Sequence, residues 1–238
     1  MNMKDLTILY YTCNEEPEYF MNNTQRILLE AVGDTPIVSV SFKPTIIGDN
    51  CTNVVLEGQT RSNYTLYKQV LMAAKIATTE YVACGEDDLL YSAEHFQYRP
   101  KKDVFAYDLN KWSIFSWTKP PIFSYRPRKL MSSLIVTREA LIRTLEERYA
   151  KYPTLEEASK TIYPLYWGEP SRFEHHLGIT PLESEEYESS VPNVMFSTAQ
   201  ALGYLHLGTR KAHSRERATE LPYWGTASSV LSLYQLSN

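Results

Sequence analysis

The protein has 238 residues, of which 43% are hydrophobic, enough for a sizeable core in one compact domain. The net charge of −4 excludes a globally basic protein, so any nucleic-acid contact would have to be local. The three cysteines share no C-x-x-C spacing, which argues against a disulfide framework or zinc site and favours a reducing, cytoplasmic location. We expect neither a signal peptide nor a membrane span, because no apolar run is long enough.

The first part of the chain predicts strands that alternate with helices. Apolar, β-rich runs predict strands at 6–11, 37–42 and 81–84. Helical spacing of apolar residues predicts helices over about 20–31 and 63–77. Such alternation predicts an α/β fold with a mostly parallel central sheet flanked by helices. Ligands of such sheets bind beyond the carboxyl ends of the strands.

The second part of the chain is less regular. The pattern predicts strands at 104–107, 114–117 and 134–136, followed by a helix over about 138–149. The acidic run 183–188 predicts a solvated surface. No repeat or low-complexity linker divides the chain, so we expect a single domain over residues 1–238.

Three adjacent carboxylates, Glu86, Asp87 and Asp88, directly follow the predicted strand at 81–84. Their mutual repulsion would be costly without a cation to offset it. Mg²⁺ and Mn²⁺ bind carboxylate oxygens together with substrate phosphates, so a divalent metal is the simplest resolution. An isolated acidic triplet is also compatible with a solvated turn, and its meaning depends on the rest of the chain.

Three motifs, in order and correctly spaced, resemble the family-2-like glycosyltransferases of the GT-A fold. Residues 12–16 (TCNEE) resemble the "YNEE" loop after the first strand of that family, and residues 61–63 (RSN) resemble its "xRN" before the next helix. Residues 77–88 (ATTEYVACGEDD) are similar to its "A-x-G-E-Y-V-x-F-L-D-D-D". The combination covers about the first ninety residues and is more specific than any one motif.

The resemblance implies a GT-A-type nucleotide-binding fold, with a nucleotide-sugar-binding half at 1–100 and an acceptor-binding and catalytic half at 101–238. It places Thr12, Asn14 and Glu15 beside the uracil and ribose, and Arg61 near the nucleotide or sugar.

For the acidic triplet the resemblance implies that Glu86 approaches the ribose and that Asp88 binds the metal. Asp87 would support this geometry or contact the sugar. The chain departs from the family pattern in having Glu86 where the first aspartate stands and Cys13 where tyrosine often stands. Glutamate keeps the negative charge on a longer arm.

Inverting transfer, which the resemblance suggests, needs a base to deprotonate the acceptor hydroxyl. Residues 167–176 (WGEPSRFEHH) resemble the "G-E-D" segment that carries this base, with Pro170 in place of the aspartate. We expect Glu169 to be the base and Glu174 to be the second candidate. The alternatives are a loop acid or helix cap for Glu169 and an exposed helix face for Glu174.

Residues 205–213 (LHLGTRKAH) are similar to a late histidine, glycine and lysine motif of some metal-dependent GT-A enzymes, shortened by one residue. The resemblance implies that His206 is a further metal ligand, with His213 as the alternative. Arg210 and Lys211 would neutralise the leaving phosphates.

Other basic residues stand in loops that carry or flank aromatic residues. They are Arg126, Arg128, Lys129, Arg215 and Arg217. They indicate either a local contact with a polyanion or a solvated surface.

Together these patterns predict a hexosyltransferase that uses Mn²⁺ or Mg²⁺ and a nucleotide diphosphate sugar, most simply a UDP-sugar. The acceptor would be a glycan, a small molecule or a modified base in phage DNA. A nucleotidyltransferase is an alternative, although residues 12–17 lack the Gly-rich loop and lysine of that class. The second alternative is a non-catalytic module that binds nucleotide sugars, because Pro170 stands where the aspartate of the base-carrying "G-E-D" segment is expected.

Overall fold

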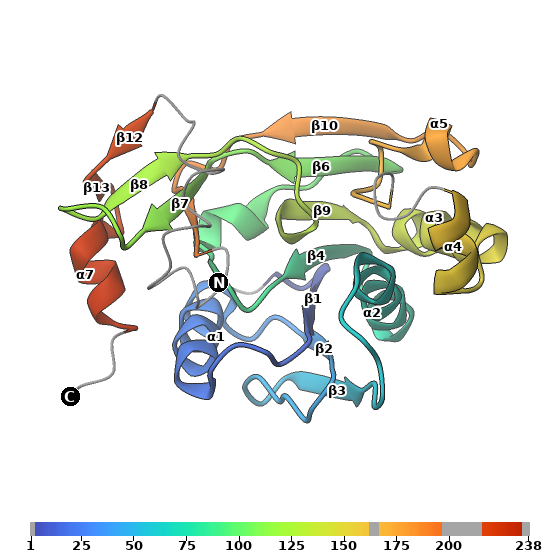
Figure 1. The fold of residues 1–238 in the computed structure, drawn as a ribbon, viewed down its shortest axis with the longest axis horizontal. Helices are drawn as coiled ribbons and strands as arrows, with labels where there is room; N and C mark the ends of the chain where they lie inside the picture. Colours follow the sequence, from blue (N-terminus) through green and yellow to red (C-terminus); the bar gives the residue numbers. More distant parts are fainter. Residues whose placement is uncertain (1–2, 162–166, 197–215, 235–238) are drawn as a thin grey trace.

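A seven-stranded sheet forms the centre of the computed structural model, which describes residues 3–161, 167–196 and 216–234 (Figure 1). The strand order is β10-β6-β9-β4-β1-β2-β3, and only β9 runs antiparallel to its neighbours. The strands are β1 (Leu6–Thr12), β2 (Ile37–Ser41), β3 (Cys51–Val55), β4 (Tyr81–Gly85), β6 (Val104–Asp108), β9 (Leu134–Thr137) and β10 (Glu183–Tyr187). The predicted mostly parallel central sheet is therefore confirmed.

A second sheet of five short strands lies to one side of the first, at the left in Figure 1. Its order is β12 (Arg217–Ala218), β8 (Ile122–Tyr125), β7 (Lys111–Phe115), β11 (Asn193–Met195) and β5 (Leu89–Leu90). The strands β13 (Glu220–Leu221) and β14 (Gly225–Thr226) form a separate pair before α7 (Ala227–Ser232). Because β4 ends at Gly85 and β5 begins at Leu89, the acidic triplet links the first sheet to the second at this point of the chain.

Helices cover both faces of the central sheet. The helical elements are α1 (Glu18–Val32), α2 (Asn63–Ile76), η1 (Ala93–Gln97), η2 (Met131–Ser133), α3 (Arg138–Lys151), α4 (Leu155–Thr161) and α5 (Glu174–Leu177). Side chains alternate across β1: Leu9 and Tyr11 enter the core under α2 and α3, whereas Ile8 and Tyr10 enter the core under α1. Burial on both faces explains why β1 is an apolar run without polar alternation.

Local sequence signals set the ends of the two helices nearest the site. Pro17 precedes α1, and Gly33 ends it with φ of +56°, a conformation that favours glycine. Ser62 is the N-cap of α2, and its hydroxyl accepts a hydrogen bond from the Thr65 amide (3.0 Å). The predicted motif at 61–63 is therefore the start of a helix.

The structure corrects several predicted elements in the less regular parts of the chain. The strand expected at 114–117 begins at Lys111 and ends at Phe115, and β3 and β8 were not predicted. The acidic run expected on a solvated surface forms the partly exposed strand β10. All three cysteines are free thiols, as predicted. Of the helices described, none has the length and apolar character that crossing a membrane requires.

Candidate functional site

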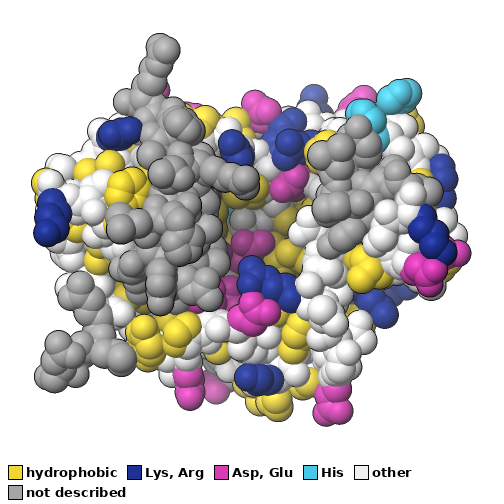
Figure 2. All heavy atoms as spheres, in the orientation of Figure 1, with side chains coloured by type: hydrophobic (Ala, Val, Ile, Leu, Met, Phe, Trp, Pro, Cys, Tyr) yellow, Lys and Arg dark blue, Asp and Glu magenta, His cyan; other side chains and the backbone are white. Residues whose placement is uncertain are grey.

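A cleft of about 370 Å³ opens at the carboxyl ends of β1, β2 and β4, beside the start of α2. Figure 2 shows it as a hollow near the centre of one face, with acidic and basic side chains in and around it. The cleft is lined by Tyr11, Thr12, Cys13, Glu16, Phe42, Arg61, Ser62, Asn63, Thr65, Leu66, Gln69, Glu86, Asp87 and Asp88. The three predicted motifs therefore meet at one place, at the carboxyl ends of the strands.

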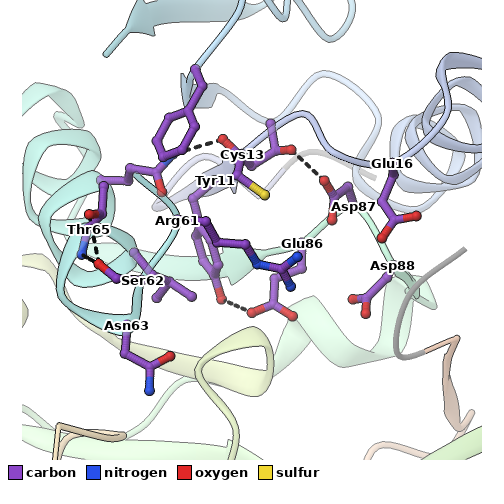
Figure 3. Close-up of a pocket in the computed structure, with 14 residues that line it drawn as sticks. Tyr11, Cys13, Glu16, Arg61, Ser62, Asn63, Thr65, Glu86, Asp87 and Asp88 are labelled. Carbon is purple, nitrogen blue, oxygen red and sulfur yellow. Dashed lines mark hydrogen bonds between the residues drawn. The ribbon is translucent and has the colours of Figure 1, made fainter. Parts of the chain in front are cut away.

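The register between β1 and β4 positions the first two acids of the triplet. The strands pair in parallel with Leu6 opposite Tyr81, and this offset continues past the strand ends. Tyr11 Oη donates a hydrogen bond to Glu86 Oε1, and Thr12 Oγ1 donates one to Asp87 Oδ2 (Figure 3). Each residue at the end of β1 thus orients one carboxylate of the triplet.

The backbone of the triplet is also held from several elements. The Glu86 amide donates to Tyr91 Oη (3.1 Å), and Thr24 Oγ1 of α1 donates to the Asp87 carbonyl (3.0 Å). The Phe196 amide donates to the Asp88 carbonyl (2.9 Å). A solvated acidic turn would not need such support, so the link between the sheets is a rigid platform for its carboxylates.

Burial changes the acidity of the triplet. It raises the pKa of Glu86 to about 7, with a further contribution from the Asp87 charge, while the hydrogen bond from Tyr11 acts in the opposite direction. Burial also raises the pKa of Asp87, and the hydrogen bond from Thr12 opposes it. The carboxylates thus lie close together in a poorly solvated site.

The donor set of the cleft suits a hard cation. Figure 3 shows the side chains of Glu16, Asp87 and Asp88 on the same side of the cleft, while Glu86 points toward its centre. In the part of the chain that the structure describes, no three His, Cys, Asp or Glu side chains form a ready-made metal site. A cation would therefore bind one or two of these carboxylates and complete its shell with ligand oxygens, as Mg²⁺ does with phosphates.

Arg61 and Glu15 form an ion pair at the mouth of the cleft. Arg61 Nη1 contacts Glu15 Oε2, and the two side chains are 58% and 52% exposed. Arg61 lines the cleft and extends toward Glu86 in Figure 3, whereas Glu15 is not among the lining residues. Glu15 therefore reaches the cleft through its contact with Arg61.

Asn14 connects the loops that follow β1 and β2. It has a left-handed backbone with φ of +56°, and its Oδ1 accepts hydrogen bonds from the amides of Phe42 (2.9 Å) and Lys43 (2.8 Å). Its Nδ2 donates to Thr45 Oγ1 (2.8 Å). Asn14 does not line the cleft, so its amide shapes the walls from behind.

Sequence patterns did not identify several lining residues, because these residues line the cleft only through the face of α2 that is turned toward it. Ser62, Thr65, Leu66 and Gln69 lie on one face of the first turns of α2, at the spacing that puts side chains on the same side. Gln69 Nε2 donates to the carbonyls of Thr12 (2.9 Å) and Val40 (2.8 Å). Helical periodicity over 63–77 would have revealed this face, although not the cleft that it borders.

The loop that carries Glu169 is attached to the cleft wall. Asn63, a lining residue, donates from Nδ2 to the Trp167 carbonyl (3.4 Å), and Tyr107 Oη donates to the Pro170 carbonyl (2.6 Å). The Glu169 side chain is 16% exposed, and its Oε2 accepts a hydrogen bond from Arg172 Nη1 (2.8 Å). Glu169 therefore lies beside the cleft, although it does not line it.

Glu174 is enclosed in a buried ion pair. Its Oε1 accepts a hydrogen bond from Arg148 Nη2 (2.6 Å), and its Oε2 accepts one from the Phe173 amide (3.2 Å). Arg148 Nη1 donates to the Gly168 carbonyl (2.7 Å). With both oxygens bound inside the protein, Glu174 supports the loop of Glu169 and is not placed to take a proton from an acceptor. The exposed residues of α5 are His175 and His176.

The remaining predicted site residues, His206 with its alternative His213, Arg210 and Lys211, lie outside the described residues.

The sequence matches no protein-family model and no curated protein. Among solved structures the chain is similar to one described as a "crystal structure of a glycosyltransferase involved in the glycosylation of the major capsid of PBCV-1". The two chains are 14% identical with a TM-score of 0.40, over 80% of this chain and 92% of that one. At this identity and TM-score the likeness says nothing of which residues act on a substrate.

Proposed function

We propose that the protein transfers a hexose from a nucleoside diphosphate sugar, most simply a UDP-sugar, to an acceptor hydroxyl. The observation that carries the proposal is the meeting of the motifs at 12–16, 61–63 and 86–88 in one cleft at the carboxyl ends of the strands. This is where α/β sheets bind nucleotides.

The cleft offers suitable contacts for each part of the donor. Phe42, a half-buried ring in the lining, provides an apolar surface for a nucleobase. Glu86 provides a carboxylate for ribose hydroxyls, and Arg61 provides a guanidinium for the phosphates or sugar. The assignments of Glu86 and Arg61 agree with the roles implied by the family resemblance, whereas Phe42 is not among the residues that the resemblance named.

The carboxylate of Asp88, supported by Asp87, would hold a divalent cation together with the diphosphate of the donor. Mg²⁺ or Mn²⁺ suits these oxygen ligands and, when bound, neutralises charge on the leaving diphosphate. Tyr11 and Thr12 hold the carboxylates of Glu86 and Asp87, and Thr24 holds the Asp87 carbonyl, so these residues would keep the site in place for the cation and the donor.

In the transfer step the acceptor oxygen attacks the anomeric carbon as the bond from this carbon to the diphosphate breaks. The proton of the acceptor hydroxyl passes to a carboxylate, for which Glu169 is the proposed base. Arg172 holds one oxygen of Glu169 and so orients its carboxylate.

A non-catalytic module that binds nucleotide sugars is the second candidate. The observation in its favour is that both predicted bases are engaged by arginines, Glu169 by Arg172 and Glu174 by Arg148. Both candidate functions predict that the donor binds, but only the transferase predicts turnover.

The decisive experiment incubates the protein with a panel of nucleotide sugars and Mn²⁺ or Mg²⁺ and measures both binding and release of the nucleoside diphosphate. Each reaction is repeated with chelator and with Asp88→Asn. Asp103→Asn is the matched control, because Asp103 forms an exposed ion pair with Arg143 away from the cleft.

The transferase proposal expects release with at least one donor, loss of release with chelator and in Asp88→Asn, and normal release in Asp103→Asn. Binding without release under all conditions would favour the non-catalytic module. Failure of every nucleotide sugar to bind would overturn both candidates, and release unaffected by chelator would overturn the metal role.

A further inference from the structure

We propose that Arg126 and Arg128 form a phosphate-binding site for a nucleic-acid strand, which makes nucleic acid the acceptor of the reaction. The inference rests on the proposed function, because it names the class of molecule that the transferase would modify. Both arginines lie in the segment between β8 and η2.

Arg126 and Arg128 differ from the other basic residues of this region in their contacts. Lys129 donates a hydrogen bond to Ser184 Oγ (2.9 Å) and pairs with Glu186 (3.3 Å), and Arg217 also has an interaction within the protein. Arg215 lies outside the described residues. Within the described ranges, neither the Arg126 nor the Arg128 side chain has a hydrogen bond or an ion pair.

The two guanidinium groups are close enough to repel each other. Burial lowers the pKa of Arg126, and the charge of Arg128 lowers it further. Cations that repel each other gain from binding an anion with several oxygens, and arginine binds phosphate in bidentate geometry.

A buried lysine holds this segment in place. The Arg126 amide donates to the Lys111 carbonyl (2.7 Å), and Lys111 Nζ donates to the Arg128 carbonyl (2.6 Å). Lys111 is fully buried, and its Nζ also donates to Ser133 Oγ (2.9 Å). The carbonyl of the neighbouring Ser132 accepts a hydrogen bond from Tyr91 Oη (2.9 Å), the group that holds the Glu86 amide, so the segment is connected to the donor site. Figure 2 shows Lys and Arg side chains along the rim of the hollow.

An aromatic pair beside the arginines favours nucleic acid over a small phosphate compound. Trp112 of β7 and Tyr125 of β8 are cross-strand partners, both partly exposed, with ring centroids 5.3 Å apart. Proteins that bind single strands combine cations for the backbone with aromatic side chains for the bases. Tyr125 immediately precedes Arg126, so both kinds of contact come from one short stretch.

The test measures binding of a fluorescent single-stranded oligodeoxynucleotide of about 16 nucleotides by anisotropy over a series of salt concentrations. The full-length protein is compared with Arg126→Gln/Arg128→Gln. The matched control is Arg26→Gln/Arg143→Gln, which removes two exposed arginines that already pair with Glu30 and Asp103. Binding of UDP is measured on all three proteins, and a polyglutamate peptide serves as a competing polyanion.

We expect the double variant at 126 and 128 to bind the oligonucleotide at least about tenfold more weakly at low salt. We also expect the slope of log affinity against log salt to fall by about one for each arginine removed. The control variant should retain the slope, and UDP binding should not change in either variant.

The inference is overturned by an absence of oligonucleotide binding, by an unchanged slope, or by competition from polyglutamate equal to that from the oligonucleotide. Loss of UDP binding in the double variant would also overturn it, because the arginines would then serve the donor diphosphate. Release of nucleoside diphosphate without oligonucleotide binding would leave the proposed function intact and remove only this inference. If the oligonucleotide binds with the expected change in slope but no nucleotide sugar binds, the phosphate-binding site stands and the proposed function fails.

Discussion

Arg148 Nη2 donates a 2.6 Å hydrogen bond to Glu174 Oε1, and the same guanidinium reaches the Gly168 carbonyl through Nη1. Both side chains of this pair are almost completely buried. The pair therefore connects α3 to α5 and also fixes the loop that presents Glu169. Glu174, the second candidate base from the sequence, therefore supports the loop of the first candidate, Glu169.

Arg148→Met should destabilise the protein by about 3 to 5 kcal/mol, because it leaves the Glu174 carboxylate buried without its partner. Urea denaturation measures this loss. Arg148→Met/Glu174→Leu should recover much of it, since no buried charge remains. Arg143→Met, which breaks only the exposed pair with Asp103, should cost less than about 1 kcal/mol. Equal losses in Arg148→Met and Arg143→Met would contradict the supporting role.

Glu169→Gln should reduce transfer by roughly 100-fold or more and leave donor binding unchanged, because the amide cannot accept the acceptor proton. Steady-state rates and calorimetric titration with UDP separate the two quantities. Arg172→Gln is the comparison, since it frees Glu169 Oε2 without removing the carboxylate. Full transfer activity in Glu169→Gln would assign the base to another residue.

Asn14→Ala should lower the stability by about 1 to 3 kcal/mol, because the amides of Phe42 and Lys43 lose their acceptor. Alanine also tolerates the left-handed backbone at this position poorly. Asn14→Asp keeps the accepting oxygen and should be milder. The free energy of unfolding and the UDP affinity are both measured. Loss of affinity at full stability would mean that Asn14 contacts the nucleotide directly.

Lys111 should make the stability depend on pH above neutrality. Burial lowers its pKa from 10.5 to about 8. Between these values the unfolded chain binds a proton that the folded protein releases, so this residue's contribution to stability rises with pH by at most about 1.4 kcal/mol per unit. Below pH 8 the burial of the charge is a constant penalty.

The measurement for Lys111 is the difference in unfolding free energy between the wild type and Lys111→Met from pH 7 to 10. The difference should shift in favour of the wild type above pH 8 and stay level below it. Lys101→Met, at an exposed position, should give a level difference throughout. A level difference for Lys111→Met would refute the depressed pKa.

The first part of the fold could be predicted because its elements are long and locally encoded. Ser62 caps α2, Gly33 ends α1, and the buried strands β1 and β4 are largely apolar runs. Strands such as β5 and β11 have two or three residues and exist because they pair with each other. No local pattern identifies such strands.

In the candidate site, too, some features follow from local sequence pattern and others from tertiary packing. The positions of Glu86, Asp87 and Asp88 at a strand end followed from local pattern. The contact of Tyr11 with Glu86 depends on the β1–β4 register, which brings together residues 75 positions apart. The burial of Glu174 depends on Arg148, 26 positions away on another helix. Both depend on tertiary packing, which a single sequence does not display.

The acidic strand β10 has a consequence for how this protein behaves in solution. It lies at one end of the central sheet, where a strand has unpaired amide and carbonyl groups that another chain can pair with. Glu183, Glu185 and Glu186 place carboxylates along this border, of which Glu186 pairs with Lys129. An approaching strand would have to bury or neutralise these charges before it could extend the sheet. The run of glutamates therefore disfavours edge-to-edge pairing with a second chain at this border of the sheet.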